Sequence, residues 1–133
     1  MRVCLDTNVL VSAFATRGLA ADVLRVVLTE HELLVPAVVL EEVERVLATK
    51  FQAPEEVRAT VLHVLQSQTV VPRPLEVLPI PVRDPADAWV LASALAGAAH
   101  VLVTGDADLL VLGSAAPLPI LTPRGFWEQL RAT

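Results

Sequence analysis

Short apolar runs alternate with longer amphipathic segments along this chain, and prolines and glycines separate them. The short runs predict strands over 2–5, 33–35, 69–71, 100–104 and 118–121. The longer segments predict helices over 8–15, 19–29, 36–49, 55–66, 84–96 and 123–130, with a further short helix after Gly105. Repeated strand–helix units of this kind place helices around a parallel sheet. The pattern therefore predicts an α/β fold, formed as one domain by residues 1–133.

The joints between these segments carry residues that begin and end helices. Asp84 and Thr122 are expected N-caps, each followed by a proline in the first turn, and Gly97 is expected to close the helix over 84–96. Prolines recur between 72 and 81, where they cannot extend a strand ladder, so this stretch is interpreted as a surface loop.

Charge and cysteine content narrow the classes of function. The net charge is −5, with one lysine (Lys50) and nine arginines, so nucleic acid contacts are expected to be local, and a basic partner chain would suit the surface. Cys4 is the single cysteine, so an internal disulfide is excluded. It lies in an apolar run and is expected to be a buried structural thiol. Neither a signal sequence nor a membrane-spanning run is evident, and a cytoplasmic, soluble protein is expected.

Five of the six aspartates fall at three places in the chain. Asp6 follows the first strand, Asp84 and Asp87 stand at a helix start, and Asp106 and Asp108 follow the strand over 100–104. Residues just beyond the carboxyl ends of parallel strands meet in one crevice. Carboxylates gathered there repel one another unless a cation neutralises them, and hard oxygen ligands favour Mg²⁺ or Mn²⁺.

Each of these acids also has a structural interpretation. Asp84 can cap its helix while Asp87 closes a capping box, and Asp106 can cap the short helix that carries Asp108 in its first turn. Asp6 has no such obvious task, because the Thr7-Asn8 pair that follows it can itself cap the next helix. Glu42 and Glu44 flank the apolar stripe of the helix over 36–49 on opposite sides, and periodicity does not choose between them.

Four segments in this order resemble the PIN-domain family, in particular the toxin-component (VapC-like) branch found beside antitoxins. They are Val3-Cys4-Leu5-Asp6-Thr7-Asn8-Val9-Leu10-Val11-Ser12, Leu40-Glu41-Glu42-Val43-Glu44-Arg45-Val46-Leu47, Arg83-Asp84-Pro85-Ala86-Asp87 and Val103-Thr104-Gly105-Asp106-Ala107-Asp108-Leu109-Leu110. Each motif alone is weak, but together they extend over nearly the whole chain with the intervals of the family.

The resemblance implies a three-layer α/β/α fold with a central parallel sheet of four to five strands. It implies a divalent-metal-dependent endoribonuclease that cleaves single-stranded RNA by metal-activated water. The acidic quartet of the family corresponds to Asp6, Glu42, Asp87 and Asp106, which selects Glu42 over Glu44. Asp108 corresponds to a frequent further acid, and Asn8 and Thr104 correspond to polar positions of the pocket. Asp84 is the alternative to Asp87 as the direct ligand, and where Asp87 is the ligand, Asp84 is expected to support it.

The resemblance also implies partners: single-stranded or structured RNA and a cognate antitoxin. The apolar excess of the chain, with only 19% charged residues, predicts in addition that exposed hydrophobic surface is covered in a homodimer. Two other classes remain open. One is a PIN-like module that binds RNA or protein without cleaving. The other is a phosphatase of the haloacid-dehalogenase type, which begins with an aspartate after its first strand but requires a second aspartate where this chain has Asn8.

Overall fold

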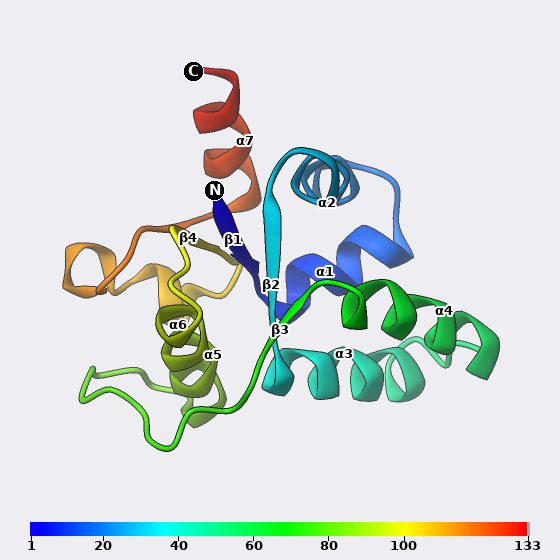
Figure 1. Ribbon diagram of the computed structural model, residues 1–133, viewed down its shortest axis with the longest axis horizontal. Coiled ribbons are helices and arrows are strands. Elements are labelled where there is room, and N and C mark those ends of the chain that lie inside the picture. The colour runs from blue at the N-terminus through cyan, green and yellow to red at the C-terminus, as the bar shows by residue number, and fades with distance from the viewer. Residues whose placement is uncertain (133) are drawn as a thin grey trace.

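The computed structural model describes residues 1–132, which form a five-stranded, fully parallel sheet with helices packed against it (Figure 1). β1 (Arg2–Leu5) is central, and the strand order is β3-β2-β1-β4-β5. β2 (Glu32–Pro36) and β3 (Thr69–Val71) lie on one side of β1, and β4 (Val101–Val103) and β5 (Ile120–Leu121) lie on the other. The sheet thus grows first one way from β1 and then the other, and this reversal opens a crevice beyond the carboxyl ends of β1 and β4.

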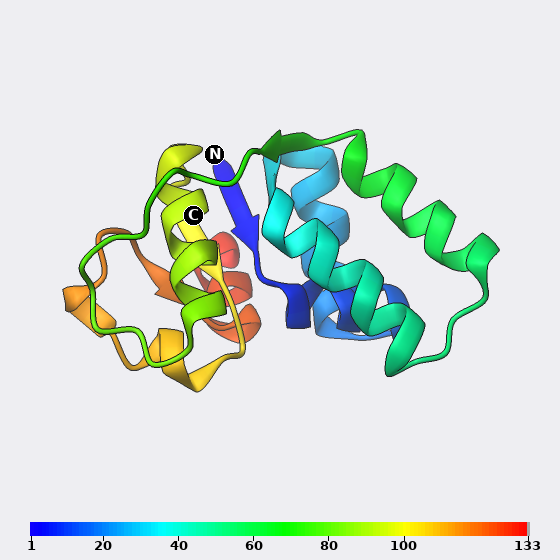
Figure 2. The ribbon, with the colours of Figure 1, turned by 90° about the horizontal axis from the view of Figure 1, so that it is seen from below.

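Seven α-helices accompany the five strands within residues 1–132. They are α1 (Thr7–Ala15), α2 (Leu19–Glu30), α3 (Ala37–Thr49), α4 (Glu55–Gln66), α5 (Pro85–Ala96), α6 (Ala107–Leu110) and α7 (Pro123–Arg131), with a 3₁₀ turn over Gly113–Ala115. Figure 2 shows α3 and α5 on the near side of the sheet and α2 and α7 behind it. None of the described helices is long and apolar enough to cross a membrane.

The predicted α/β fold and its elements are confirmed, with boundaries that shift by one or two residues. Pro36 ends β2 instead of opening the next helix, which begins at Ala37. The caps behave as expected: the Asp84 carboxylate accepts a hydrogen bond from the Ala86 amide at 3.0 Å, and the Thr122 hydroxyl accepts one from Gly125 at 2.9 Å. The proline-spaced stretch is a loop, and Leu75 on it is fully exposed.

The core lies between the sheet and its helices. Val3, Cys4 and Leu5 of β1 have no exposed surface, as expected for a parallel strand covered on both faces. Burial, together with the nearby charge of Asp6, raises the pKa of the Cys4 thiol, so it stays protonated and serves packing. Gly97 closes α5 where a Cβ atom would meet Val71 Cγ2 at 2.8 Å, so the glycine permits close packing of this helix end against β3.

Candidate active site

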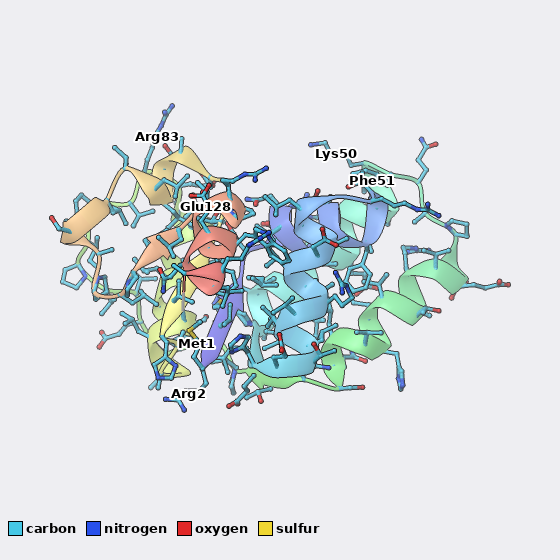
Figure 3. All side chains as sticks on the ribbon, turned by 90° about the horizontal axis from the view of Figure 1, so that it is seen from above. Met1, Arg2, Lys50, Phe51, Arg83 and Glu128 are labelled. Carbon is cyan, nitrogen blue, oxygen red and sulfur yellow. The ribbon has the colours of Figure 1, made fainter. Side chains whose placement is uncertain are left out.

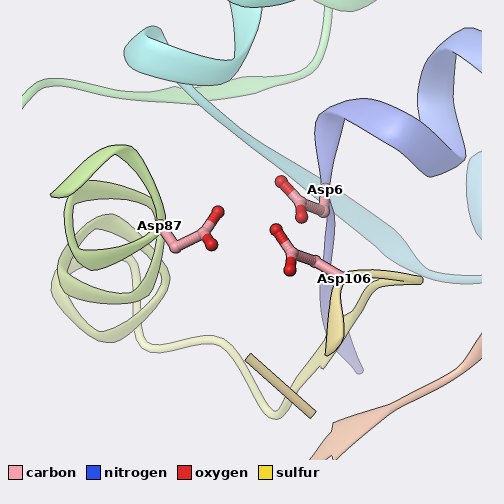
Figure 4. A group of neighbouring side chains, drawn as sticks. All are labelled: Asp6, Asp87 and Asp106. Atoms are coloured by element: carbon pink, nitrogen blue, oxygen red, sulfur yellow. The ribbon is translucent and has the colours of Figure 1, made fainter. Parts of the chain in front are cut away.

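Three aspartates from distant parts of the sequence face one another at the sheet crevice (Figure 4). Asp6 follows β1, Asp106 follows β4, and Asp87 lies in the first turn of α5. One carboxylate oxygen from each of them lies within 4.8 Å of the other two. Asp6 and Asp87 are only 4% and 7% exposed, and Asp106 is half-buried. The strand ends and the helix start predicted from the sequence therefore do converge.

The Asp6 carboxylate is held by hydrogen bonds on both of its oxygens. Oδ1 accepts from the Thr7 amide at 2.8 Å, and Oδ2 accepts from the Thr104 hydroxyl at 2.7 Å and from Asn8 Nδ2 at 3.3 Å. Asp6 is thus the N-cap of α1, which begins at Thr7. The expectation that Asp6 lacks a structural task was wrong, because the backbone places its own carboxylate, and not the side chain of Thr7 or Asn8, against the first free amide.

Thr104 and Asn8 tie the ends of β1 and β4 together. The Thr104 hydroxyl that donates to Asp6 also accepts a hydrogen bond from the Asp106 amide at 3.0 Å. Asn8 Oδ1 accepts from the Gly105 amide at 3.1 Å. Both polar residues that the motif comparison placed at the pocket thus orient the carboxylates, and the amide of Asn8 has its oxygen committed to the backbone of the next loop.

Asp87 differs from its neighbour Asp84 in what its side chain contacts. Asp84 is exposed and caps α5, and its side chain also lines the crevice. Asp87 is buried, and its Oδ2 has no hydrogen-bond partner within residues 1–132. No capping-box hydrogen bond from the Asp87 side chain is present among these residues, because the carboxylate turns into the crevice instead. A buried oxygen without a partner is costly unless a ligand satisfies it.

The remaining acids of the predicted set take different positions. Glu42 is half-buried and lines the same cavity as the three aspartates, although it is not part of their tight group, and Arg45 Nη2 lies 3.7 Å from its Oε2. Glu44 is exposed and does not line the cavity. Asp108 points elsewhere: its Oδ1 lies 4.0 Å from Arg83 Nη1, outside the carboxylate group. Its part in metal binding stays a prediction.

The crowding of carboxylates changes their protonation. Burial raises the pKa of Asp6 and outweighs the hydrogen bonds from Thr104 and Thr7, which lower it; the charges of Glu42 and Asp106 add smaller increases. Burial, followed by the adjacent Asp106 carboxyl and the charges of Asp6 and Asp84, raises the pKa of Asp87 to about 8. Without a cation, the group therefore holds a proton at neutral pH that isolated aspartates would release.

These side chains fit a hard divalent cation. The tight group offers only carboxylate oxygens, Mg²⁺ and Mn²⁺ prefer such ligands, and the partnerless Asp87 oxygen faces the group. No histidine or cysteine belongs to the group, so the donors do not suit a thiolate- or imidazole-bound metal. The residues present thus match Mg²⁺ or Mn²⁺ better than zinc.

The crevice is a cavity of about 380 Å³, and it extends well beyond the carboxylates. Its other walls come from α1, from α3 and from the residues that directly follow these two helices. They include Val11, Ser12, Ala15, Thr16, Val46, Lys50 and Phe51. The motif comparison missed Lys50 and Phe51. The helical period would have found Lys50, because Glu42, Val46 and Lys50 are spaced four residues apart and share a helix face.

The comparison with protein families gives a direct result. The profile of the PIN domain matches residues 2–108. The chain belongs to the PIN-domain family. The match covers β1 through the start of α6, and so includes Asp6, Glu42, Asp87 and Asp106. It confirms the family resemblance and argues against a haloacid-dehalogenase phosphatase. The comparison with curated proteins gave no match.

Solved structures share the PIN fold of this chain. A chain of VapBC2 from Rickettsia felis, bound to a DNA fragment from the promoter, is 18% identical, with a TM-score of 0.63 over 91% of this chain and 97% of that one. A chain of FitAcB from Neisseria gonorrhoeae is 17% identical, with a TM-score of 0.60 over 92% of this chain and 98% of that one. At these identities the likeness establishes the three-layer fold.

Proposed function

We propose that this PIN domain is a Mg²⁺- or Mn²⁺-dependent endoribonuclease that cleaves single-stranded RNA, and that it is the toxin of a toxin–antitoxin pair. PIN domains are generally nucleases, and the observation that carries the proposal is the convergence of Asp6, Asp87 and Asp106 within 4.8 Å beside Glu42. The tight group itself offers only carboxylates, with no serine or cysteine to attack a phosphate as a nucleophile. Hydrolysis by water is the chemistry that it suits.

The carboxylates would hold the cation, with Asp6 and Asp106 fixed in direction by their hydrogen bonds and Asp87 offering its partnerless oxygen. When bound, a divalent ion lowers the pKa of water and offsets negative charge on a phosphate. Thr104 and Asn8 keep Asp6 in one orientation, so little reorganisation is needed when ligands enter. Attack of water on phosphorus with departure of the 3′ oxygen yields 3′-hydroxyl and 5′-phosphate ends.

Removal of metal gives the first test of this proposal. The purified chain is expected to cleave a labelled single-stranded RNA in Mg²⁺ or Mn²⁺ and to lose this activity in chelator, because the acids alone repel the phosphate. Product ends are mapped by their need for phosphatase treatment before kinase labelling. Equal cleavage in chelator and in metal, or 2′,3′-cyclic phosphate products, would refute the metal-dependent hydrolysis. Absence of any cleavage would favour the silent binding module.

The toxin assignment is supported by the motifs that resemble the toxin-component branch and by the likeness to a chain of VapBC2 solved with promoter DNA. The acidic crevice and the net charge of −5 suit an antitoxin with a basic or amphipathic segment across the crevice. A homodimer is also proposed, since apolar side chains such as Leu75 and Val111 are 101% and 79% exposed. Co-expression with the product of the adjoining gene, followed by co-purification, tests the antitoxin assignment.

A further inference from the structure

The carboxylate centre, formed by Asp6, Asp87 and Asp106, lies where two cavities meet. The cavity of about 380 Å³ contains the aspartates, and a second of about 160 Å³ lies beside it between α3 and α5. Thr7, Glu42 and Ala86 line both cavities. Val38, Glu42, Val46 and Lys50 share one face of α3, so the two cavities together follow about 18 Å of that helix, which runs across the face seen in Figure 2. The centre is therefore the middle of a groove and not its end.

One end of this groove carries Lys50 and Phe51. Phe51 is 48% exposed and lines the larger cavity beside Lys50. Lys50 is exposed and has no ion-pair partner within residues 1–132. Figure 3 shows the two side chains together at one edge of the molecule, with Met1 and Arg2 at the opposite edge. Because β1 begins at Arg2, the edge with Lys50 and Phe51 is the one at which the parallel strands end. A half-exposed ring beside a free ammonium suits a base and its phosphate.

The other end of the groove carries Arg73 and Trp89. The Arg73 guanidinium lies 4.1 Å from the centroid of the Trp89 ring, and both residues line the smaller cavity. Arg73 is exposed and, like Lys50, forms no ion pair with the described acids. Stacking on the ring fixes the guanidinium plane while its edge donors stay available for a phosphate.

The charges along the groove define its ligand. The middle is acidic and repels phosphates, so a nucleic acid must gain its affinity at positions away from the cleavage point. The free cations of the groove stand at its two ends, each next to an aromatic ring. A basic protein segment bound at the acidic middle would leave both cation–aromatic pairs without a partner, although Glu41 also lines the smaller cavity beside Arg73. The cation–aromatic pairs at the ends thus favour a single nucleic acid strand over a peptide.

We propose that single-stranded RNA lies along α3, with one flanking nucleotide held by Lys50 and Phe51 and the other by Arg73 and Trp89. This inference rests on the proposed nuclease function and adds the residues that position the strand. A groove that continues on both sides of the carboxylates requires nucleotides on both sides of the cleaved bond. Binding at these two local contacts, without a broad basic surface, explains how a chain of net charge −5 can hold RNA.

Equilibrium binding tests the groove. A fluorescein-labelled 12-nucleotide single-stranded RNA is titrated in Ca²⁺ in place of Mg²⁺, with a gel to verify that it stays intact. Lys50→Ala, Phe51→Leu and Arg73→Ala are each expected to weaken binding about tenfold. Each of the two charge removals also reduces the magnitude of the slope of log K against log salt by about 0.7, whereas Phe51→Leu leaves that slope unchanged. Arg25→Ala on α2, which lines neither cavity, is the matched control and keeps the native affinity and slope.

The outcomes separate this inference from the function on which it rests. Native cleavage with equal RNA affinity and equal salt slope in all variants would leave the nuclease standing and overturn the groove, including the case in which a protein segment occupies it. Loss of affinity in the three variants without cleavage by the native chain would support the groove and refute the nuclease. Failure of the native chain to bind the RNA overturns the groove outright. Thermal unfolding of each variant verifies that the fold is retained.

Discussion

Asp6→Asn is expected to lower RNA cleavage by roughly three orders of magnitude. The substitution keeps the size of the side chain but removes the buried negative charge that faces Asp87 and Asp106. It also puts an amide where Thr104 Oγ1 and Asn8 Nδ2 now donate to a carboxylate oxygen. Initial cleavage rates in Mn²⁺, together with calorimetric titration of Mn²⁺, are expected to show loss of activity and weaker metal binding together.

Two controls make this result specific. Asp22→Asn changes an aspartate of α2 that is paired with Arg25 and lies outside the crevice, and it should keep the native rate. Glu42→Gln and Glu44→Gln change neighbouring glutamates of α3, of which only Glu42 lines the crevice, so only the former should slow cleavage. Native turnover by a folded Asp6→Asn protein would end the nuclease proposal.

Metal-free protein is expected to lose stability as the pH rises from about 4 to about 8. The pKa of Asp87 is raised by burial and by the Asp106 carboxyl to about 8, from 3.8 for an unperturbed aspartate. Between these values the folded state binds a proton that the unfolded chain has released, so the free energy of unfolding decreases with pH. One such proton contributes at most about 1.4 kcal/mol per pH unit. The raised pKa of Asp6 acts in the same direction.

Urea denaturation in chelator across this pH range measures the effect. Asp87→Asn, which cannot ionise, is expected to flatten the dependence and to stabilise the metal-free protein at pH 8, while Asp22→Asn retains the native slope. Addition of Mn²⁺ to the native chain should restore stability at high pH, because the cation replaces the proton. A native stability that rises with pH, or a slope in Asp87→Asn as steep as the native one, would contradict the proposed crowding of carboxylates.

Local chemistry explains why so much of the fold could be predicted. Alternating apolar runs, the Asp84-Pro85 and Thr122-Pro123 helix starts and the proline-spaced loop act over a few residues, and the structure bears out each of them. Asp6 shows where this reasoning ends: which of three neighbouring polar side chains caps α1 depends on backbone angles that the sequence does not state. The same holds for Asp87, whose place in a first turn predicted a cap but whose carboxylate faces two acids from other elements.

The sequence by itself determined the α/β class, the positions of strands and helices, and the ordered acidic motifs of the PIN family, because hydrophobic period and motif spacing are properties of the linear chain. Only the tertiary structure decided which acids meet. It placed Asp106 in the carboxylate group and Asp108 outside it, and it put Lys50 and Phe51 in the groove of the carboxylates. Glu42, which the family motif had already selected over Glu44, lines the same crevice. Contacts between side chains of different elements depend on strand order and on helix packing across the sheet, because these bring together residues that are far apart in sequence.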